Sequence, residues 1–291
     1  MYRCYNPKKF KFLLLLDIII VILYFIGSAI SRSIHSVGSF QAQEGIFLPI
    51  VMYHSITDTT TNGDYQITKE QFAQDLYYLY ANGYETVSVG DLLAYTEGKC
   101  ELPKKPVMLT FDDGFYNNLS LALPLLEEYN MCAVVSVVGY YTDETAEKDP
   151  HVNNYSYLTW EDIKLLQKSG RIEIGSHTYN LHSNNQRAGC SIMYGEDSEN
   201  YQDMLYEDLN QLQTRAKEQT GFAPVAFAYP YGFICKESIP VLKKLGFVCT
   251  FSCREQGNYI TRDAECLYGL DRYNRSPNYS TEEFFTKILN Y

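Results

Sequence analysis

The sequence predicts an α/β fold in which a parallel sheet closes, or nearly closes, into a barrel. Short apolar runs of strand character alternate with amphipathic segments of helical character along most of the 291 residues. Several apolar runs end directly in charged or polar residues, as parallel strands do at the end where α/β folds build their sites. Residues 46–291 are long enough for one domain with a substantial core, and no internal repeat divides them.

The elements can be placed from caps and periodicity. Thr68 has the pattern of a helix cap with Gln71 reaching back to it, and Gly83 ends that helix. Its inner stripe comprises Phe72, Leu76 and Leu79. Three more helices are expected over residues 160–167, 199–219 and 237–245. Strands are expected over residues 46–52, 107–111, 133–138, 172–175, 225–228 and 247–251.

Asp112, Asp113 and Gly114 directly follow the apolar run 107–111. Neighbouring carboxylates repel, so both remain ionised only if a positive group lies between them, or if one takes a proton while the other binds a cation. A metal ion is the simplest solution. The structural alternative is that Asp-Asp-Gly forms a turn.

His177 and His182 follow a second apolar run and lie five residues apart. On a helix this step would turn them roughly 140° away from each other, so they should occupy a strand end and the loop after it. With Asp113 they would form a metal site of two imidazoles and one carboxylate, with positions open for water and substrate. A hydrogen-bonded surface histidine is the alternative for each.

A third apolar run ends in Tyr229, Pro230, Tyr231 and Gly232. Proline fixes its own φ and glycine permits a sharp turn, so the backbone amide of Tyr231 can be directed rigidly at a ligand. We therefore expect Tyr231 to be an oxyanion donor, and Tyr229, Pro230 and Tyr231 to contribute to substrate binding.

In this order, the three motifs resemble those of the polysaccharide deacetylases of the NodB-homology type, carbohydrate esterase family 4. The resemblance runs from about Ile46 to the end of the chain. It is strongest for the branch that acts on poly-N-acetylglucosamine and related surface glycans, which shares the five-residue histidine step and the pair Tyr53-His54. It implies a distorted (β/α)7 barrel and a metal-dependent hydrolase of non-peptide amide bonds. Zinc is the default metal, and cobalt, nickel or iron also suit the ligands.

Two departures from the family pattern affect the expected mechanism. Ala228 stands where many members have an arginine that holds the catalytic aspartate, and Arg272 is the expected substitute; a surface ion pair is the alternative for Arg272. The late histidine that serves many members as general acid is also absent, because no histidine follows His182. Of the remaining histidines, only His54 lies at a strand end. We expect His54 to be the acid, with a structural role as the alternative.

The expected reaction is metal-assisted amide hydrolysis. Asp112 would act as general base, His54 would protonate the departing sugar amine, and acetate would leave. A peptidoglycan N-acetylglucosamine deacetylase is the alternative within the same class. A non-catalytic glycan-binding protein that keeps the fold is the alternative from another class, and the intact Asp112, Asp113, His177 and His182 argue against it.

Residues 12–30 are nearly all apolar over roughly the 20 residues that a spanning helix requires. Only Arg32 follows this segment closely, whereas four basic residues precede it: Arg3, Lys8, Lys9 and Lys11. The positive-inside rule predicts a cytoplasmic tail (1–11), a single-pass membrane anchor (12–30), a tether (31–45) and an extracellular domain (46–291). A cleaved signal peptide is the alternative. Asp17 lies inside the span, where it would be protonated or paired with a partner helix.

Composition restricts the partners of the exterior part. Without residues 1–33, 19 basic and 34 acidic residues remain, a formal charge of −15 that repels the phosphate backbone of nucleic acid. The 27 tyrosines suit stacking on sugars, although many should be packing residues. Cys4 would be cytoplasmic, so seven cysteines lie outside and cannot all pair within one chain. Cys249, Cys253 and Cys266 are the best disulfide candidates.

Overall fold

The computed structural model describes residues 44–148 and 151–289, and its main element is an eight-stranded sheet. Seven strands follow the order β10-β9-β8-β7-β6-β2-β12, and the eighth strand, β5, pairs with β6 outside this order. All these pairs are parallel, which confirms the predicted α/β class. The strands are β2 (Ile50–Tyr53), β5 (Glu85–Thr86), β6 (Pro106–Phe111), β7 (Ala133–Val137), β8 (Ile172–Ser176), β9 (Ala226–Ala228), β10 (Cys249–Phe251) and β12 (Tyr273–Asn274).

The sheet curls because one segment contacts both of its ends. Phe251 of β10 forms a parallel bridge with Leu270, and Tyr273 pairs with Val51 of β2. Residues 270–274 therefore pass from one end of the strand order to the other. The carboxyl ends of β2, β6 and β8 open on the same side of the curled sheet, because these strands are parallel.

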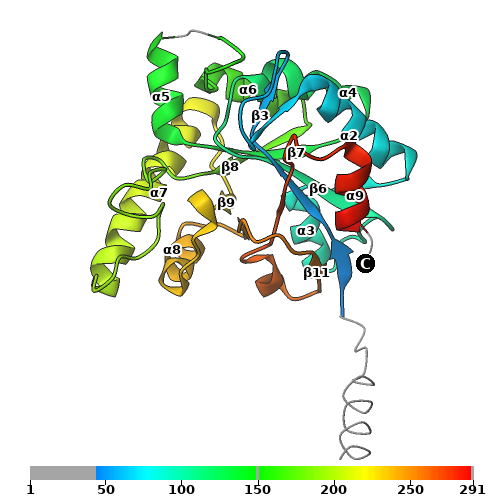
Figure 1. Cartoon of the computed structure of the whole chain (residues 1–291). Coiled ribbons are helices and arrows are strands. Elements are labelled where there is room, and N and C mark those ends of the chain that lie inside the picture. The colour runs from blue at the N-terminus through cyan, green and yellow to red at the C-terminus, as the bar shows by residue number, and fades with distance from the viewer. Residues whose placement is uncertain (1–43, 149–150, 290–291) are drawn as a thin grey trace, which may run out of the picture. The chain divides into compact units, whose positions relative to one another are not determined.

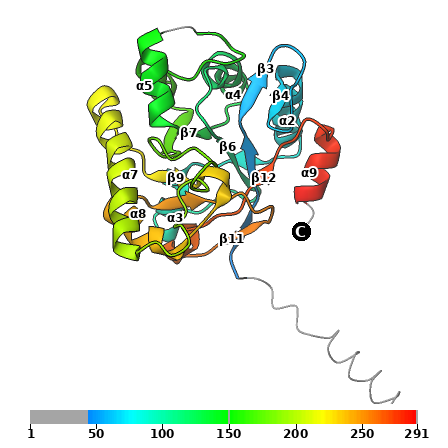
Figure 2. The ribbon, with the colours of Figure 1, turned by 60° about the vertical axis from the view of Figure 1, so that its left-hand side comes forward.

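Helices cover the outside of the sheet. Figure 1 shows α7 and α8 on one flank and α2 with α9 on the other, and Figure 2 again shows α9 beside α2. The helices are α2 (Lys69–Ala81), α3 (Val89–Thr96), α4 (Leu123–Glu128), α5 (Gly139–Lys148), α6 (Trp160–Lys168), α7 (Ser198–Thr220), α8 (Ile239–Lys244) and α9 (Thr281–Leu289). The predicted cap is confirmed, because Gln71 N–H donates to Thr68 and Gln71 Oε1 accepts from Thr68 N–H.

Two expected elements are divided. The run 46–52 forms β1 (Ile46–Leu48), which pairs antiparallel with β11 (Asn258–Ile260), and then β2. Pro49 lies between them and lacks the N–H that would continue a ladder. Residues 237–245 form the end of a 3-10 turn, Lys236–Ser238, followed by α8. Two short strands, β3 (Ser55–Thr57) and β4 (Gln66–Thr68), pair in parallel beyond β2.

Alternation along the strands separates two faces. Val51, Leu109 and Val135 belong to the core cluster under α2, α6 and α9, whereas Met108 and Val134 belong to another cluster with β9 and β10. Successive side chains of a strand point to opposite faces. Met108 faces the inside of the curled sheet. Asp112 is four residues further along the same strand direction, so it faces the same side, at the end of β6.

Several expectations concern residues that the structure does not describe. The tail, the membrane anchor, Asp17 and nearly all of the tether lie outside the described residues. Among the residues that are described, no helix is long and apolar enough to span a membrane. The seven cysteines in this part are free, so pairing among Cys249, Cys253 and Cys266 is not observed. Cys249 is fully buried in the core, whereas Cys253 faces the cavity described below.

Candidate active site

Three parallel strands deliver the predicted site residues to one cavity. His54 follows β2, Asp112 and Asp113 follow β6, and His177 follows β8. Backbone hydrogen bonds continue the ladder into these positions, from Asp112 N–H to the Tyr53 carbonyl (3.0 Å) and from His177 N–H to the Val137 carbonyl (2.9 Å). The side chains are therefore held by the sheet itself.

Asp113, His177 and His182 form a compact ligand set. Nε2 of His182 lies 3.2 Å from Asp113 Oδ1, and Nε2 of His177 lies 3.6 Å from the same oxygen. One ligand atom from each residue lies within 4.8 Å of the others. The strand end and following loop expected for the two histidines are observed. Atoms at these separations can share a single divalent cation with little movement.

The tautomer of His177 favours metal binding. Its Nδ1 lies 2.8 Å from the carbonyl oxygen of Ala228, which can only accept, so Nδ1 carries the proton. Burial lowers the pKa of His177, although the charges of Asp112 and Asp113 oppose this effect. The ring is therefore neutral, with the lone pair of Nε2 directed at Asp113.

Asp113 presents an unsatisfied oxygen to the same point. Its Oδ1 is buried, and among the described residues it makes no hydrogen bond of good geometry, although Nε2 of His182 lies 3.2 Å away. Its backbone has a φ of 70°, which is uncommon for a residue with a side chain, so the strand end is shaped at some cost in strain. A buried orphan carboxylate oxygen beside two imidazole nitrogens fits a bound cation.

Asp112 does not join this cluster, because Arg272 binds it from the other side. The guanidinium donates to both carboxylate oxygens, at 2.8 Å and 2.7 Å, and is itself fully buried. Burial alone would raise the pKa of Asp112, but the charge of Arg272 and the hydrogen bonds that it donates hold this pKa well below its usual range. This contact agrees with the prediction that Arg272 replaces the arginine missing at position 228. The alternative, that Arg272 forms an ion pair at the surface, is wrong because its side chain is buried.

His54 lies at the cavity, as expected of a general acid. Its ring packs edge-on against Tyr65, with ring centroids 4.8 Å apart. Its Nδ1 is buried without a hydrogen-bond partner in the described part of the chain, so this atom is not committed to a structural contact. The catalytic role of His54 stays a prediction.

The third motif needs a correction. Tyr231 lines the cavity, has a φ of 58°, and stacks on His182 with ring centroids 5.1 Å apart. Tyr229, expected to bind substrate, is instead fully buried in the core and pairs its hydroxyl with Ser238 at 2.7 Å. Along β9, Ala226 and Ala228 face the cluster inside the curled sheet, whereas Phe227 and Tyr229 alternate with them and pack in a different cluster, away from the cavity. Pro230 is buried against Gly189 and does not line the cavity either.

The cavity has a volume of about 660 Å³. Besides the predicted residues, its lining includes Tyr65, Phe115, Asn154, Cys253 and Glu255. Sequence analysis assigned none of these residues to the site, although Phe115 directly follows Gly114 and Cys253 lies two residues beyond β10. Tyr65 is 59% exposed and Tyr231 is 43% exposed, so two aromatic faces are open to a ligand.

Comparisons with known proteins relate the chain to one family. Residues 99–250 match the family model described as polysaccharide deacetylase. A poly-β-1,6-N-acetyl-D-glucosamine N-deacetylase of Escherichia coli strain K12 is 26% identical over 263 residues, which cover 82% of this chain and 38% of that protein. One of Staphylococcus aureus strain MSSA476 is 24% identical over 193 residues, 66% of this chain and 63% of that protein. The chain thus spans less than two thirds of the length of either relative.

Solved structures with the same fold include IcaB from Ammonifex degensii, with a TM-score of 0.68 and 27% identity over 83% of this chain and 97% of that one. A de-N-acetylase from Aggregatibacter actinomycetemcomitans has a TM-score of 0.69 and 25% identity, covering 82% of this chain and 99% of the other. The likeness extends over the described domain.

Proposed function

Because this chain belongs to the polysaccharide deacetylase family, we propose that it removes acetyl groups from N-acetylglucosamine residues of an extracellular or cell-wall polysaccharide. The observation that carries the proposal is the pairing of two neighbouring carboxylates with different partners. Asp113 faces His177 and His182, whereas Asp112 is held by Arg272. One carboxylate is thus available for a metal and the other for a proton.

The residues fit a divalent metal, which Asp113, His177 and His182 would hold. A bound ion would polarise the acetyl carbonyl and make the attacking water more acidic. Asp112 accepts the proton of that water, and Arg272 keeps Asp112 ionised and oriented. The backbone amide of Tyr231 stabilises the oxyanion. His54 donates a proton to the sugar nitrogen as the carbon–nitrogen bond breaks, which releases acetate and a free amine. Zinc is the expected ion.

The proposed substrate is a chain of N-acetylglucosamine. A cavity of about 660 Å³ is larger than a single sugar needs, and the exposed faces of Tyr65 and Tyr231 suit stacking on sugar rings. The acidic exterior suits a glycan that becomes cationic as acetyl groups leave. The names of the relatives specify poly-β-1,6-N-acetylglucosamine.

Acetate release tests the proposal. Purified protein should release acetate from poly-N-acetylglucosamine oligomers faster than from peptidoglycan, and a chelator should abolish the release. Asp112→Asn serves as the inactive control because it removes the base, and its circular dichroism must match that of the unaltered protein because the variant leaves Arg272 without its carboxylate. Faster release from peptidoglycan would indicate that peptidoglycan is the substrate. Binding to the oligomers without release of acetate would favour a non-catalytic glycan-binding protein.

Metal analysis tests the ligand set separately. His177→Ala and Asp113→Ala should lose bound metal together with activity, because each removes one of three ligands. Asp112→Asn should keep the metal and lose turnover. Full metal occupancy in His177→Ala would remove this histidine from the site.

The proposed location is the outer face of the cell membrane, with residues 12–30 as an uncleaved anchor. The apolar length of this segment and the basic residues before it support this topology.

A further inference from the structure

The loop between His177 and His182 must hold two ligands at a fixed separation, and its backbone is bound from outside by a side chain of α7. Asp208 accepts a hydrogen bond from Tyr179 N–H through Oδ1 (2.8 Å) and from Asn180 N–H through Oδ2 (2.8 Å). We propose that Asp208 is a positioning residue for the candidate metal site. The proposal rests on the metal-dependent function proposed above.

The rest of the loop backbone is fixed by two backbone amides at the start of α5 and by one side chain of the loop itself. The amides of Gly139 and Tyr140 donate to the carbonyls of Thr178 (3.1 Å) and Tyr179 (2.8 Å). Leu181 N–H donates to the hydroxyl of Thr178 within the loop (3.1 Å). Thr178 has a φ of 72°, so the chain turns sharply directly after His177. The amides of α5 bind two carbonyls of the loop, and Asp208 binds two of its N–H groups. Together these contacts keep the strained turn in place.

The chemistry of the contact requires a carboxylate. Two adjacent N–H groups point at the side chain, and a carboxylate offers an acceptor oxygen to each. An asparagine would offer one oxygen, and its amide hydrogens would oppose the second N–H. Burial raises the pKa of Asp208 to about 6, against the lowering effect of the two amides. No salt bridge of Asp208 is found in the described part of the chain, so an ion pair does not account for its place on α7.

Metal affinity is the direct test. The full chain, purified in detergent and stripped of metal, would be titrated with zinc in competition with a chromophoric chelator. Asp208→Asn should weaken zinc binding by roughly 10-fold, and Asp208→Ala by up to about 100-fold, the usual range for residues that orient metal ligands. Glu207→Gln is the matched control, because Glu207 is the exposed neighbour on the same helix. Its zinc affinity should equal that of the unaltered protein.

Thermal unfolding of the metal-free proteins separates positioning from simple stabilisation. A variant that melts at a lower temperature but binds zinc with unchanged affinity would overturn the proposal. Asp208→Asn keeps the size of the side chain and remains informative if Asp208→Ala fails to fold. Zinc binding without acetate release by the unaltered protein would refute the proposed function alone. Acetate release with unchanged zinc affinity in Asp208→Asn would refute the role of Asp208 alone.

Discussion

Arg272 and Asp112 form an almost fully buried ion pair, with side chains 0% and 2% exposed. Removing one partner of such a pair leaves a buried charge and typically costs about 3–5 kcal/mol. Arg272→Met should therefore lower the free energy of unfolding by about this amount, measured with urea. Lys164→Met is the control, since Lys164 pairs with Glu161 at the surface and should cost about 0–1 kcal/mol. An equal effect of both substitutions would contradict the buried pairing.

The same pair predicts a pH dependence. The folded protein lowers the pKa of Asp112, so its stabilisation is present above the unfolded pKa and is lost as pH falls through the folded pKa. Without Arg272, burial is less opposed and the pKa rises. The acid limb of the activity profile should thus move to higher pH in Arg272→Met, measured as kcat/KM against pH. An unmoved acid limb would mean that this limb reports a group other than Asp112.

His54 carries a separate prediction. If it protonates the leaving amine, His54→Ala should keep its metal and fold while kcat falls by roughly 10²–10⁴. The alkaline limb of the kcat profile should also flatten, because that limb would report loss of the imidazolium proton. Near-normal turnover with an unchanged alkaline limb would assign the proton to another group and leave His54 a structural residue.

Residues at strand ends could be predicted from the sequence, because an apolar run followed by a polar residue fixes both position and direction. Asp112, Asp113 and His177 belong to this class, and His182 lies in the loop that follows β8. Tyr229 was misassigned because the motif identifies its neighbours in the sequence but not the side of the sheet to which its side chain points. Asp208 could not be found, since a carboxylate in a polar helix resembles a solvated surface residue until its distant partners, Tyr179 and Asn180, are known.

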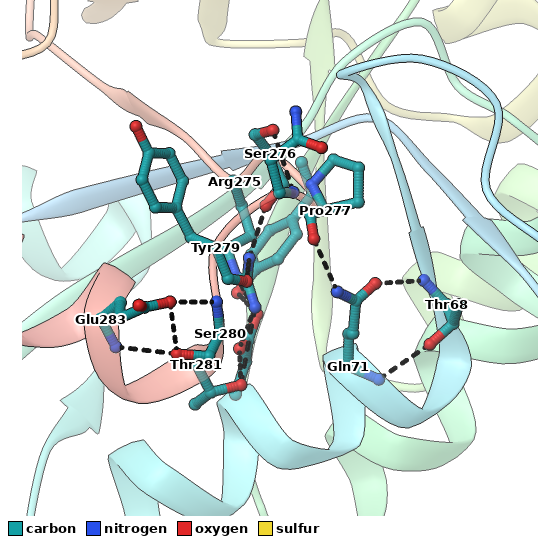
Figure 3. Close-up of polar contacts among 12 residues, drawn as sticks. Thr68, Gln71, Arg275, Ser276, Pro277, Tyr279, Ser280, Thr281 and Glu283 are labelled. Carbon is teal, nitrogen blue, oxygen red and sulfur yellow. Dashed lines mark hydrogen bonds and ion pairs between the residues drawn. The ribbon is translucent and has the colours of Figure 1, made fainter.

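At the scale of elements, a second buried ion pair joins α2 to the C-terminal segment. Arg275 donates to both oxygens of Asp75, at 2.8 Å and 3.0 Å, and both side chains are fully buried. Tyr53 and Thr281 add hydrogen bonds to the same carboxylate. Figure 3 shows Arg275 and Thr281 in this network, and beside them Gln71, which donates to the Pro277 carbonyl at 3.1 Å.

This network predicts how α9 is retained. Asp75→Ala leaves Arg275 without its carboxylate and should cost about 3–5 kcal/mol in unfolding free energy. Amide hydrogen exchange should accelerate in α9 before the rest of the domain, since Asp75 accepts a hydrogen bond from Thr281 at the start of α9 and Arg275 binds the carbonyl of Tyr279 just before it. Glu282→Gln, an exposed change on α9 itself, should leave exchange unaltered. Uniform acceleration across the domain would show that the pair stabilises the whole fold equally.

The sequence predicted strands with long apolar runs and some of the capped helices, whereas elements defined by distant contacts and several short helices were missed. β12 has two residues, and its pairing with β2 depends on chain segments more than 200 residues apart. The helices α3 and α9 have capping residues but are short, with eight and nine residues. Short segments of this kind obtain their stability from packing, which a local pattern does not contain.

For the whole molecule, the class of fold followed from the order of strands and helices, because parallel strands need helical crossovers. The same alternation predicted a sheet that closes or nearly closes, but local patterns did not identify the contact that produces the curl. It depends on residues 270–274, which contact β10 at Leu270 and β2 at Tyr273. No periodicity in those five residues distinguishes a closing segment from an ordinary loop.

The last prediction concerns the topology of the complete chain. The basic residues before the apolar segment 12–30 should stay in the cytoplasm, and the acidic domain should lie outside the cell. Protease added to intact cells should therefore digest the domain, which before treatment should fractionate with the membrane. A cytoplasmic marker protein must survive the same treatment, and lysis must expose it. A mature chain recovered free in the medium, beginning near Ile30, would show that the segment is a cleaved signal peptide. Protection of the domain in intact cells would show the opposite orientation, in which the domain could not reach an extracellular glycan.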